Sequence, residues 1–154
     1  MAAVWAGLSQ CYAALAEQVR QRYDVDLTSV GALGVSAMMH GYLAFDADGR
    51  LLTPFRTWRN TNTGEAAERL SAEFGHNIPH RWSVAHLYQA VLNGEDHVGQ
   101  IGHLTTLAGY VHWQLTGEKV LGIGDASGMV PIDIVTPGSY EPAMLRHFDQ
   151  LAAE

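Results

Sequence analysis

The apolar run Val30–Val35 is the feature that most constrains the fold of this chain. It contains only small and apolar residues, and such a run is typical of a strand buried on both faces of a parallel sheet. The run is followed by Met38-Met39-His40-Gly41, where an imidazole and a glycine interrupt the apolar pattern. Ligands bind at the carboxyl ends of strands in an open α/β sheet. The pattern therefore predicts a buried strand with a candidate ligand site at its carboxyl end.

A hairpin is expected directly after this site. The second apolar run, Tyr42–Phe45, is followed by Asp46–Arg50, which contains an Asp-Gly pair. Asp-Gly accepts the positive φ of a tight turn. The chain then returns as Leu51–Phe55 and reaches Trp58-Arg59-Asn60. The return therefore ends in a second set of aromatic and polar residues.

Helical periodicity flanks the hairpin on both sides. Apolar residues at spacings of three and four predict a helix over Val4–Tyr23, with Cys11 on its apolar face as a buried structural thiol. Ile101–Thr106 is expected to be a short strand and Val120–Val130 an irregular loop. Further helices are predicted after an Asn62 cap up to Gly75, after a Ser83 cap up to Leu92, over Leu107–Leu115, and from Pro142 to Ala153.

The chain offers few parallel neighbours for the predicted strand Val30–Val35. A helix that feeds a buried strand is half of a strand–helix–strand crossover. We infer that residues 1–154 are a single fragment of a larger α/β domain, with a truncated mixed sheet packed by helices.

Charge and composition exclude several classes of function. The formal net charge is −7, which argues against a nucleic-acid or anionic-membrane surface. No apolar run approaches the ~18 residues of a membrane span, and the first residues lack the basic region of a signal peptide. A single cysteine forbids an internal disulfide. A reducing, cytoplasmic setting is therefore expected, with neither a membrane nor a nucleic acid as partner.

Two other site types are disfavoured by spacing. His76, His80 and His86 could suggest a metal site, but Pro79 breaks the helical face that would join the first two. Gly34-Val35-Ser36-Ala37-Met38 lacks the last glycine of a hydrolase nucleophile elbow. No metal site and no serine nucleophile are expected.

The order of the motifs resembles that of the FGGY carbohydrate kinases, and within them the pentulose kinases of xylulokinase and ribulokinase type. The resemblance covers about Trp5–Asp133 and implies part of an actin-like, ribonuclease H-like ATPase lobe. It rests on G-V-S-A-M-M-H-G, the D-G turn, L-L-T-P-F-R-T-W-R-N, the L-T-G-E of Leu115–Glu118 and the G-D-A-S-G of Gly124–Gly128.

The resemblance implies roles for individual residues. Met39 and His40 would line the sugar pocket, Trp58 would flank the sugar, and Arg59 and Asn60 would lie near it. From the residues alone, a core methionine and a structural histidine are the favoured interpretation of Met39 and His40. For Trp58, a core tryptophan beside a solvated Arg59 is as well supported as a sugar contact. Xylulokinases more often show W-N-D where this chain has Trp58-Arg59-Asn60, which leaves the exact sugar open. The loop Asp125–Gly128 would shape the pocket wall.

The implied reaction is transfer of the ATP γ-phosphate to a hydroxyl of a pentulose or similar sugar. Phosphoryl transfer needs a phosphate-binding loop, a metal carboxylate and a base, and the sequence contains neither a G-x-x-x-x-G-K-[ST] nor a D-x-G-T loop. ATP and Mg²⁺ are therefore expected in the full-length parent, with a catalytic aspartate outside this chain. The isolated chain is predicted to be inactive, and its partners to be a sugar and the rest of its own kinase chain.

Two other classes of function remain open. One is a non-catalytic sugar-binding or regulatory module that lacks the phosphate machinery. The other is a structural interaction domain that forms a homodimer through an exposed sheet edge.

Overall fold

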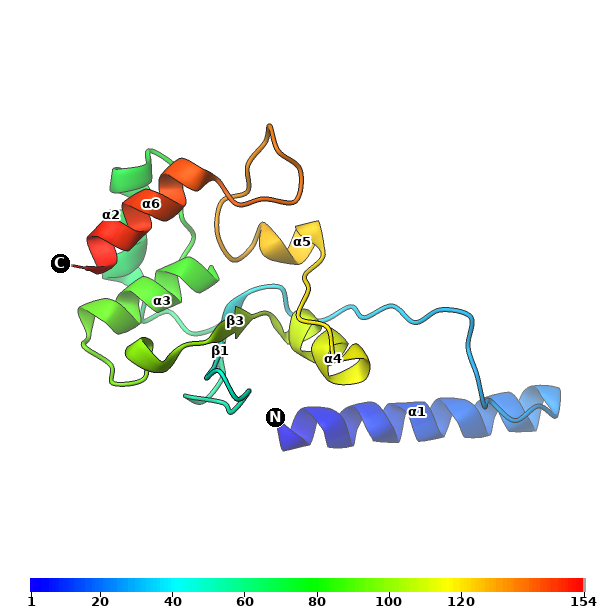
Figure 1. Cartoon of the computed structure of the whole chain (residues 1–154). Coiled ribbons are helices and arrows are strands. Elements are labelled where there is room, and N and C mark those ends of the chain that lie inside the picture. Colours follow the sequence, from blue (N-terminus) through cyan, green and yellow to red (C-terminus); the bar gives the residue numbers. More distant parts are fainter. Residues whose placement is uncertain (154) are drawn as a thin grey trace. The chain divides into compact units, whose positions relative to one another are not determined.

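The structure is a computed structural model that describes residues 1–153. The chain forms two compact units, Met1–Gly34 and a second unit that begins at Val35. Figure 1 shows the helices and strands of both units in chain order. Each unit is described by itself below.

Helix α1, Ala2–Tyr23, makes up most of the first unit. It ends at Asp24, which adopts a left-handed conformation with φ 54° and donates its N–H to the carbonyl of Arg20. The helix was predicted correctly, but the burial of Cys11 was wrong, because the thiol is exposed and α1 has no buried residue. A helix buries its apolar side only against another element, and the first unit contains no second helix or strand.

The prediction of a buried strand over Val30–Val35 was also wrong. This segment has no regular secondary structure, and Leu33 is 67% exposed. A strand must pair its backbone N–H and C=O groups with neighbouring strands. None of the three strands in residues 1–153 pairs with this segment, so its sequence is apolar without forming a strand.

The sheet of the second unit has the strand order β2-β1-β3. Strand β1, Gly41–Phe45, is buried at every position, which confirms the second apolar run as a strand. It pairs antiparallel with β2, Arg56–Thr57, and with β3, His103–Thr105. The described sheet is therefore wholly antiparallel, whereas the sequence predicted a mixed one.

The turn Asp46–Arg50 follows β1 as predicted. Gly49 has φ +80°, and the N–H of Asp46 donates to the carbonyl of Arg50 at 2.9 Å. The Asp46 carboxylate accepts from the backbone N–H of Arg50 at 2.8 Å. An isolated bridge joins Phe45 to Leu51, so the chain turns back along β1.

Helices α2, Gly64–Phe74, and α3, Ser83–Leu92, form the main core, and α6, Pro142–Ala152, packs against it. These helices gather on one side of the second unit (Figure 1). Pro142 occupies the first turn of α6, and Gly75 ends α2 with φ 58°, both as predicted. The core is apolar and consists of Ala66, Ala67, Leu70, Ile78, Val84, Ala85 and Tyr88.

The predicted helix caps were displaced by tertiary contacts. Thr63, not Asn62, precedes α2, and Trp82, not Ser83, precedes α3. The Thr63 hydroxyl donates to the carbonyl of His80 at 2.7 Å, and the Ser83 hydroxyl donates to the carbonyl of Gly41 at 2.6 Å. These hydroxyl groups therefore connect the ends of helices to other segments.

Helix α4, Leu107–Thr116, begins after Thr106, whose hydroxyl accepts from the N–H of Gly109 at 3.0 Å. Tyr110 and Trp113 of α4 pack against Phe45 of β1, with ring centroids 5.4 and 5.2 Å from that of Phe45. The segment expected to be an irregular loop contains the short helix α5, Ile123–Ala126. A short 3-10 helix, η1, spans Val98–Gln100.

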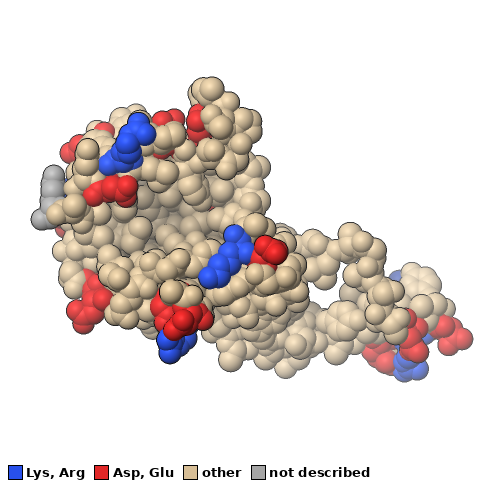
Figure 2. Space-filling model, viewed as in Figure 1, with Lys and Arg blue, Asp and Glu red and all other residues tan. Residues whose placement is uncertain are grey.

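None of the helices within residues 1–153 is both long enough and apolar enough to cross a membrane. Basic and acidic side chains are scattered and mixed over the face shown in Figure 2.

Candidate functional site

The pairing of β1 with β2 brings the two predicted halves of the site together. Gly41 pairs with Thr57, and the residues just beyond this pair are His40 and Trp58. Gly41 has φ +115°, and a Cβ atom there would lie 2.5 Å from the carbonyl oxygen of Arg56. Glycine is therefore required for both the backbone conformation and the close approach of β2.

An open pocket of about 1040 Å³ lies beside this pair. Met39, His40, Trp58 and Asn60 all line it, so the structure brings together residues that the sequence singled out from two separate segments. Trp58 is 48% exposed, which rules out a core tryptophan. The remaining lining residues are Ala37, Met38, Thr61, Asn77, Pro79, His80 and Arg81.

Arg59 is the one predicted sugar-contact residue that does not line the pocket. Its guanidinium carbon instead lies 5.2 Å from the centroid of the Trp58 ring. A cation over an indole face is attracted by the ring quadrupole. Arg59 is thus placed to hold the orientation of Trp58 from outside the pocket.

The sequence did not indicate the wall formed by Asn77–Arg81. This segment connects α2 to α3, and the carbonyl of Arg81 accepts from the N–H of Gly41 at 3.0 Å. The contact joins residues that are distant in sequence and follow no motif. The only available signal was the concentration of polar residues between two helices, which is typical of any connection.

The three histidines considered as metal ligands lie in different environments. His80 lines the pocket, His76 packs against Trp82 with ring centroids 6.2 Å apart, and His86 is fully buried beside Tyr42. Within residues 1–153 no three His, Cys, Asp or Glu side chains are grouped so as to hold a metal ion.

The imidazole of His40 lies directly before the first residue of β1 and lines the pocket. Its Nδ1 atom lies 3.4 Å from the carbonyl oxygen of Gly128. Burial lowers the pKa of His40, the nearby charge of Arg81 lowers it further, and the Gly128 contact and Asp125 partly oppose this shift. The ring is therefore neutral near pH 7, since the ordinary pKa of histidine is about 6.5.

The predicted wall loop Asp125–Gly128 does not line the pocket itself, and Gly128 instead lies against the lining residues Met39 and His40. Thr106 donates its hydroxyl hydrogen to the carboxylate of Asp125 at 3.1 Å, which ties the loop to the start of α4. A Cβ atom on Gly128 would lie within 3.0 Å of Met39 and His40. The loop thus supports the two residues proposed to contact the sugar.

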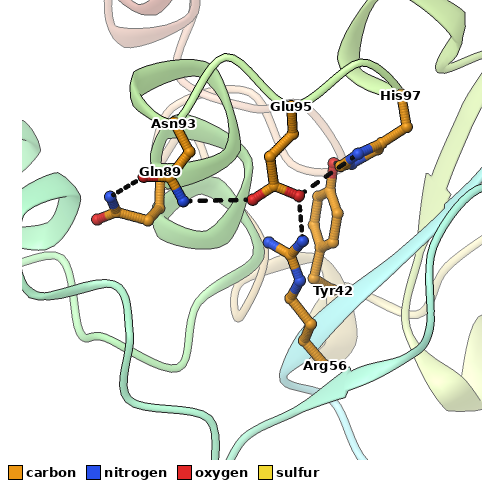
Figure 3. A network of polar contacts seen from close by, with 6 residues as sticks. All are labelled: Tyr42, Arg56, Gln89, Asn93, Glu95 and His97. Carbon is orange, nitrogen blue, oxygen red and sulfur yellow. Dashed lines mark hydrogen bonds and ion pairs between the residues drawn. The ribbon is translucent and has the colours of Figure 1, made fainter.

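A network of polar side chains connects β1 and β2 to the segment after α3 (Figure 3). Arg56 of β2 forms an ion pair with Glu95, and the hydroxyl of Tyr42 of β1 is hydrogen-bonded to Nε2 of His97 at 2.8 Å. Glu95 also contacts Nδ1 of His97 at 3.5 Å. The network therefore connects both strands to the segment that follows α3.

Helix α3 joins the same network through its last turn. Asn93 donates to the Glu95 carboxylate at 3.4 Å, and Gln89 donates to Asn93 at 3.1 Å. The guanidinium carbon of Arg56 also lies 5.3 Å from the centroid of the Tyr42 ring. Because Tyr42 pairs with Arg56, these contacts fix the two strands whose ends carry His40 and Trp58.

A pocket at the end of paired strands, lined by polar, aromatic and histidine side chains, is typical of domains that bind small molecules. The profile described as "FGGY family of carbohydrate kinases, N-terminal domain" matches residues 1–152. The chain belongs to this family, as its motifs indicated.

Two solved structures share the fold. A xyloylose kinase from Brucella ovis is 22% identical, with a TM-score of 0.70, over 86% of this chain and 29% of that chain. A xylulose kinase from Bifidobacterium adolescentis is 17% identical, with a TM-score of 0.62, over 80% of this chain and 32% of that chain. The predicted fold class is confirmed as the α/β fold of the N-terminal lobe of sugar kinases. The chain spans about a third of the length of these two structures.

Proposed function

We propose that this chain is the sugar-binding part of the N-terminal lobe of an ATP-dependent carbohydrate kinase whose substrate is a pentulose or similar ketose. The observation that carries the proposal is the convergence of Met39, His40, Trp58 and Asn60 on one pocket. Family membership supports the kinase class. The fold shared with two xylulose-type kinases favours a ketose as the substrate.

The pocket has the chemistry that a polyol requires. Imidazole and amide groups supply hydrogen-bond donors and acceptors, and His40, Asn60 and Asn77 are such groups in its lining. The indole face of Trp58 and the side chain of Met39 supply apolar surface for sugar C–H groups. These residues would bind and orient the sugar, which is a large part of catalysis in phosphoryl transfer.

The described residues do not fit a Mg²⁺–ATP site. The sequence contains neither a G-x-x-x-x-G-K-[ST] nor a D-x-G-T loop to hold the phosphates, and Mg²⁺ that binds with ATP is held largely through those phosphates. ATP and Mg²⁺ are therefore proposed to bind other parts of the full-length kinase. The general base is proposed to be an aspartate there, and this chain alone is proposed to be inactive.

The test is a calorimetric titration of the chain with xylulose, ribulose and glycerol, repeated with His40→Ala. We expect a ketose to bind and the substitution to weaken binding by about tenfold, the effect of one lost hydrogen bond to a buried polar group. The same chain with ATP and Mg²⁺ is expected to release no sugar phosphate. Binding that His40→Ala leaves unchanged, or phosphorylation by the chain alone, would contradict the proposal.

An activity assay of the full-length protein distinguishes the proposed kinase from a non-catalytic sugar-binding module. Ketose phosphorylation by the longer protein, lost on His40→Ala with the ATP affinity unchanged, is the expected result. A longer protein that binds ketose and does not phosphorylate it would support the module instead.

A further inference from the structure

The contact between His40 and Gly128 joins the start of β1 to the loop after α5. Nδ1 of His40 lies 3.4 Å from the carbonyl oxygen of Gly128, and the two residues are 88 positions apart in the sequence. No other hydrogen bond of the His40 ring is found within residues 1–153. Gly128 is therefore the one residue within 1–153 that forms a hydrogen bond with this imidazole.

Position 128 requires a glycine because the side chains of His40 and Met39 leave no room for a Cβ atom. Its φ lies outside the left-handed region, so its backbone conformation is open to any residue. A Cβ atom there would lie 2.6 Å from Nδ1 of His40, 2.7 Å from Cε1 of His40 and 3.0 Å from Cε of Met39. A side chain of any size would push the imidazole away from the carbonyl.

Both partners of this contact are held in place. The N–H of Gly128 donates to the carbonyl of Asp125 at 3.0 Å, and the carbonyl of Met129 accepts from the N–H of Val84 in α3 at 2.9 Å. On the other side, the carbonyl of Met38 accepts from the N–H of Leu107 at 3.2 Å. The carbonyl of Gly128 thus faces His40 from a fixed position.

A carbonyl oxygen accepts hydrogen bonds and donates none. The ring nitrogen that faces it must therefore carry the hydrogen. A neutral imidazole has one N–H donor and one acceptor nitrogen, and burial keeps the pKa of His40 below its ordinary value. The second nitrogen, Nε2, is then an acceptor at the pocket that His40 lines.

We propose that Gly128, through its carbonyl and its lack of a side chain, fixes His40 as the Nδ1–H tautomer, so that Nε2 accepts a hydrogen bond from a hydroxyl of the sugar. The sugar contact rests on the proposed function. The tautomer rests on the structure of this chain alone. Gly128 is a positioning residue, and the site selects a ligand that offers a hydroxyl donor at this place.

The tautomer is tested without any sugar. Long-range ¹H–¹⁵N NMR of the chain labelled at histidine, near neutral pH, distinguishes a protonated from an unprotonated ring nitrogen. We expect Nδ1 of His40 to be protonated and Nε2 to be the acceptor, with the signals assigned by their loss in His40→Ala. A protonated Nε2 in the unsubstituted chain would overturn the assignment.

Two alanine substitutions, one at Gly128 and one in the adjacent helix α5, test the role of Gly128. Gly128→Ala is expected to mix the two tautomers and to weaken ketose binding by about tenfold. Gly124→Ala is the matched control, because a Cβ atom at Gly124 meets nothing within 4 Å. It should change neither the tautomer of His40 nor the affinity for ketose. Equal effects of the two substitutions, or an unchanged tautomer in Gly128→Ala, would refute the role of Gly128.

Two substitutions of His40 test whether Nε2 is the atom that accepts the hydrogen bond from the sugar. The amide of glutamine reaches the place of Nε2, whereas that of asparagine reaches only the place of Nδ1. His40→Gln should therefore keep more ketose affinity than His40→Asn, and the reverse order would overturn the assignment of Nε2. A chain with the expected tautomer that binds no ketose would support the role of Gly128 and contradict both the sugar contact and the proposed function.

Discussion

Gly41 pairs with Thr57 across β1 and β2, and this single pairing brings His40 and Trp58 to the same pocket. The two pocket residues lie on either side of a hairpin whose turn, Asp46–Arg50, is far from the pocket end of the strands. The geometry of the site therefore depends on strand register. A shift of one residue would move Trp58 away from His40 and turn its side chain to the other face.

The first prediction concerns Gly41 itself. Gly41→Ala should lower the free energy of unfolding by at least about 2 kcal/mol, because the new Cβ atom would lie 2.5 Å from the carbonyl oxygen of Arg56 at a φ of +115°. Urea denaturation measures this loss. Gly75→Ala is the control, since it has φ +58° and no atom within 4 Å, and it should cost only about 1 kcal/mol. Similar losses would mean that the approach of β2 is not tight.

The second prediction concerns the ion pair behind the strands. Glu95→Gln should destabilise the chain by about 1–3 kcal/mol, because the Arg56 side chain is only 16% exposed and would lose its charged partner. Glu17→Gln is the control, since its pair with Arg20 is solvent-exposed and its loss should have no measurable effect. Denaturation with urea compares the two, and equal midpoints would show that the network carries no stability.

The same ion pair predicts that the stability of the fold decreases at acidic pH. The hydrogen bond from Arg56 holds the pKa of Glu95 below its ordinary value, so the folded chain binds this proton less readily than the unfolded chain. The stability from the pair is then complete above the unfolded pKa of a glutamate and is lost as the pH falls through the lowered value. Glu95→Gln should remove this part of the acid dependence, and an unchanged profile would contradict it.

The third prediction concerns His86, which is fully buried with no hydrogen-bond partner for either ring nitrogen within residues 1–153. Burial lowers its pKa to about 4, and Arg56 adds to the shift. Stability should be complete above the unfolded pKa of about 6.5 and fall by up to about 3 kcal/mol as the pH drops toward 4. His86→Phe should flatten this decline, and His76→Phe, at an exposed position, should not. A decline unaffected by His86→Phe would place the titrating group elsewhere.

The fourth prediction concerns ketose binding and pH. Because burial lowers the pKa of His40, the neutral ring and its acceptor nitrogen should persist to a pH below the ordinary value for histidine. Ketose affinity should stay constant near neutral pH and fall when His40 becomes protonated in acid. Calorimetric titration at several pH values tests this, and His40→Gln, whose amide does not titrate, should show a flat profile. A fall in affinity toward alkaline pH would contradict the prediction.

The sequence predicted the elements whose cause is local. The Asp-Gly turn, the glycine after α2, and Pro142 in the first turn of α6 each follow from backbone preferences of a few residues. The site residues Met39, His40 and Trp58 were found through the resemblance, and the structure places them in one pocket. Their contact with a sugar remains a prediction.

The features that were missed have non-local causes. Val30–Val35 has the composition of a buried strand, but strand formation depends on neighbours that residues 1–153 do not supply. The pocket wall at Asn77–Arg81 is held by contacts with residues outside the segment, among them those of Arg81 with Gly41 and of His80 with Thr63. The hydroxyl of Ser83 donates a hydrogen bond to the carbonyl of Gly41 instead of capping α3. Such pairings leave no periodic signal in the sequence.

The distance in sequence between His40 and Gly128 also governs when the site can exist during synthesis. After His40 is added, the ribosome must add 88 more residues before its partner is present. At about 5 to 20 residues per second, this takes several seconds. A growing chain therefore carries His40 and Trp58 long before it carries the carbonyl that orients the imidazole, so a ligand has no completed site to bind until most of this sequence has been made.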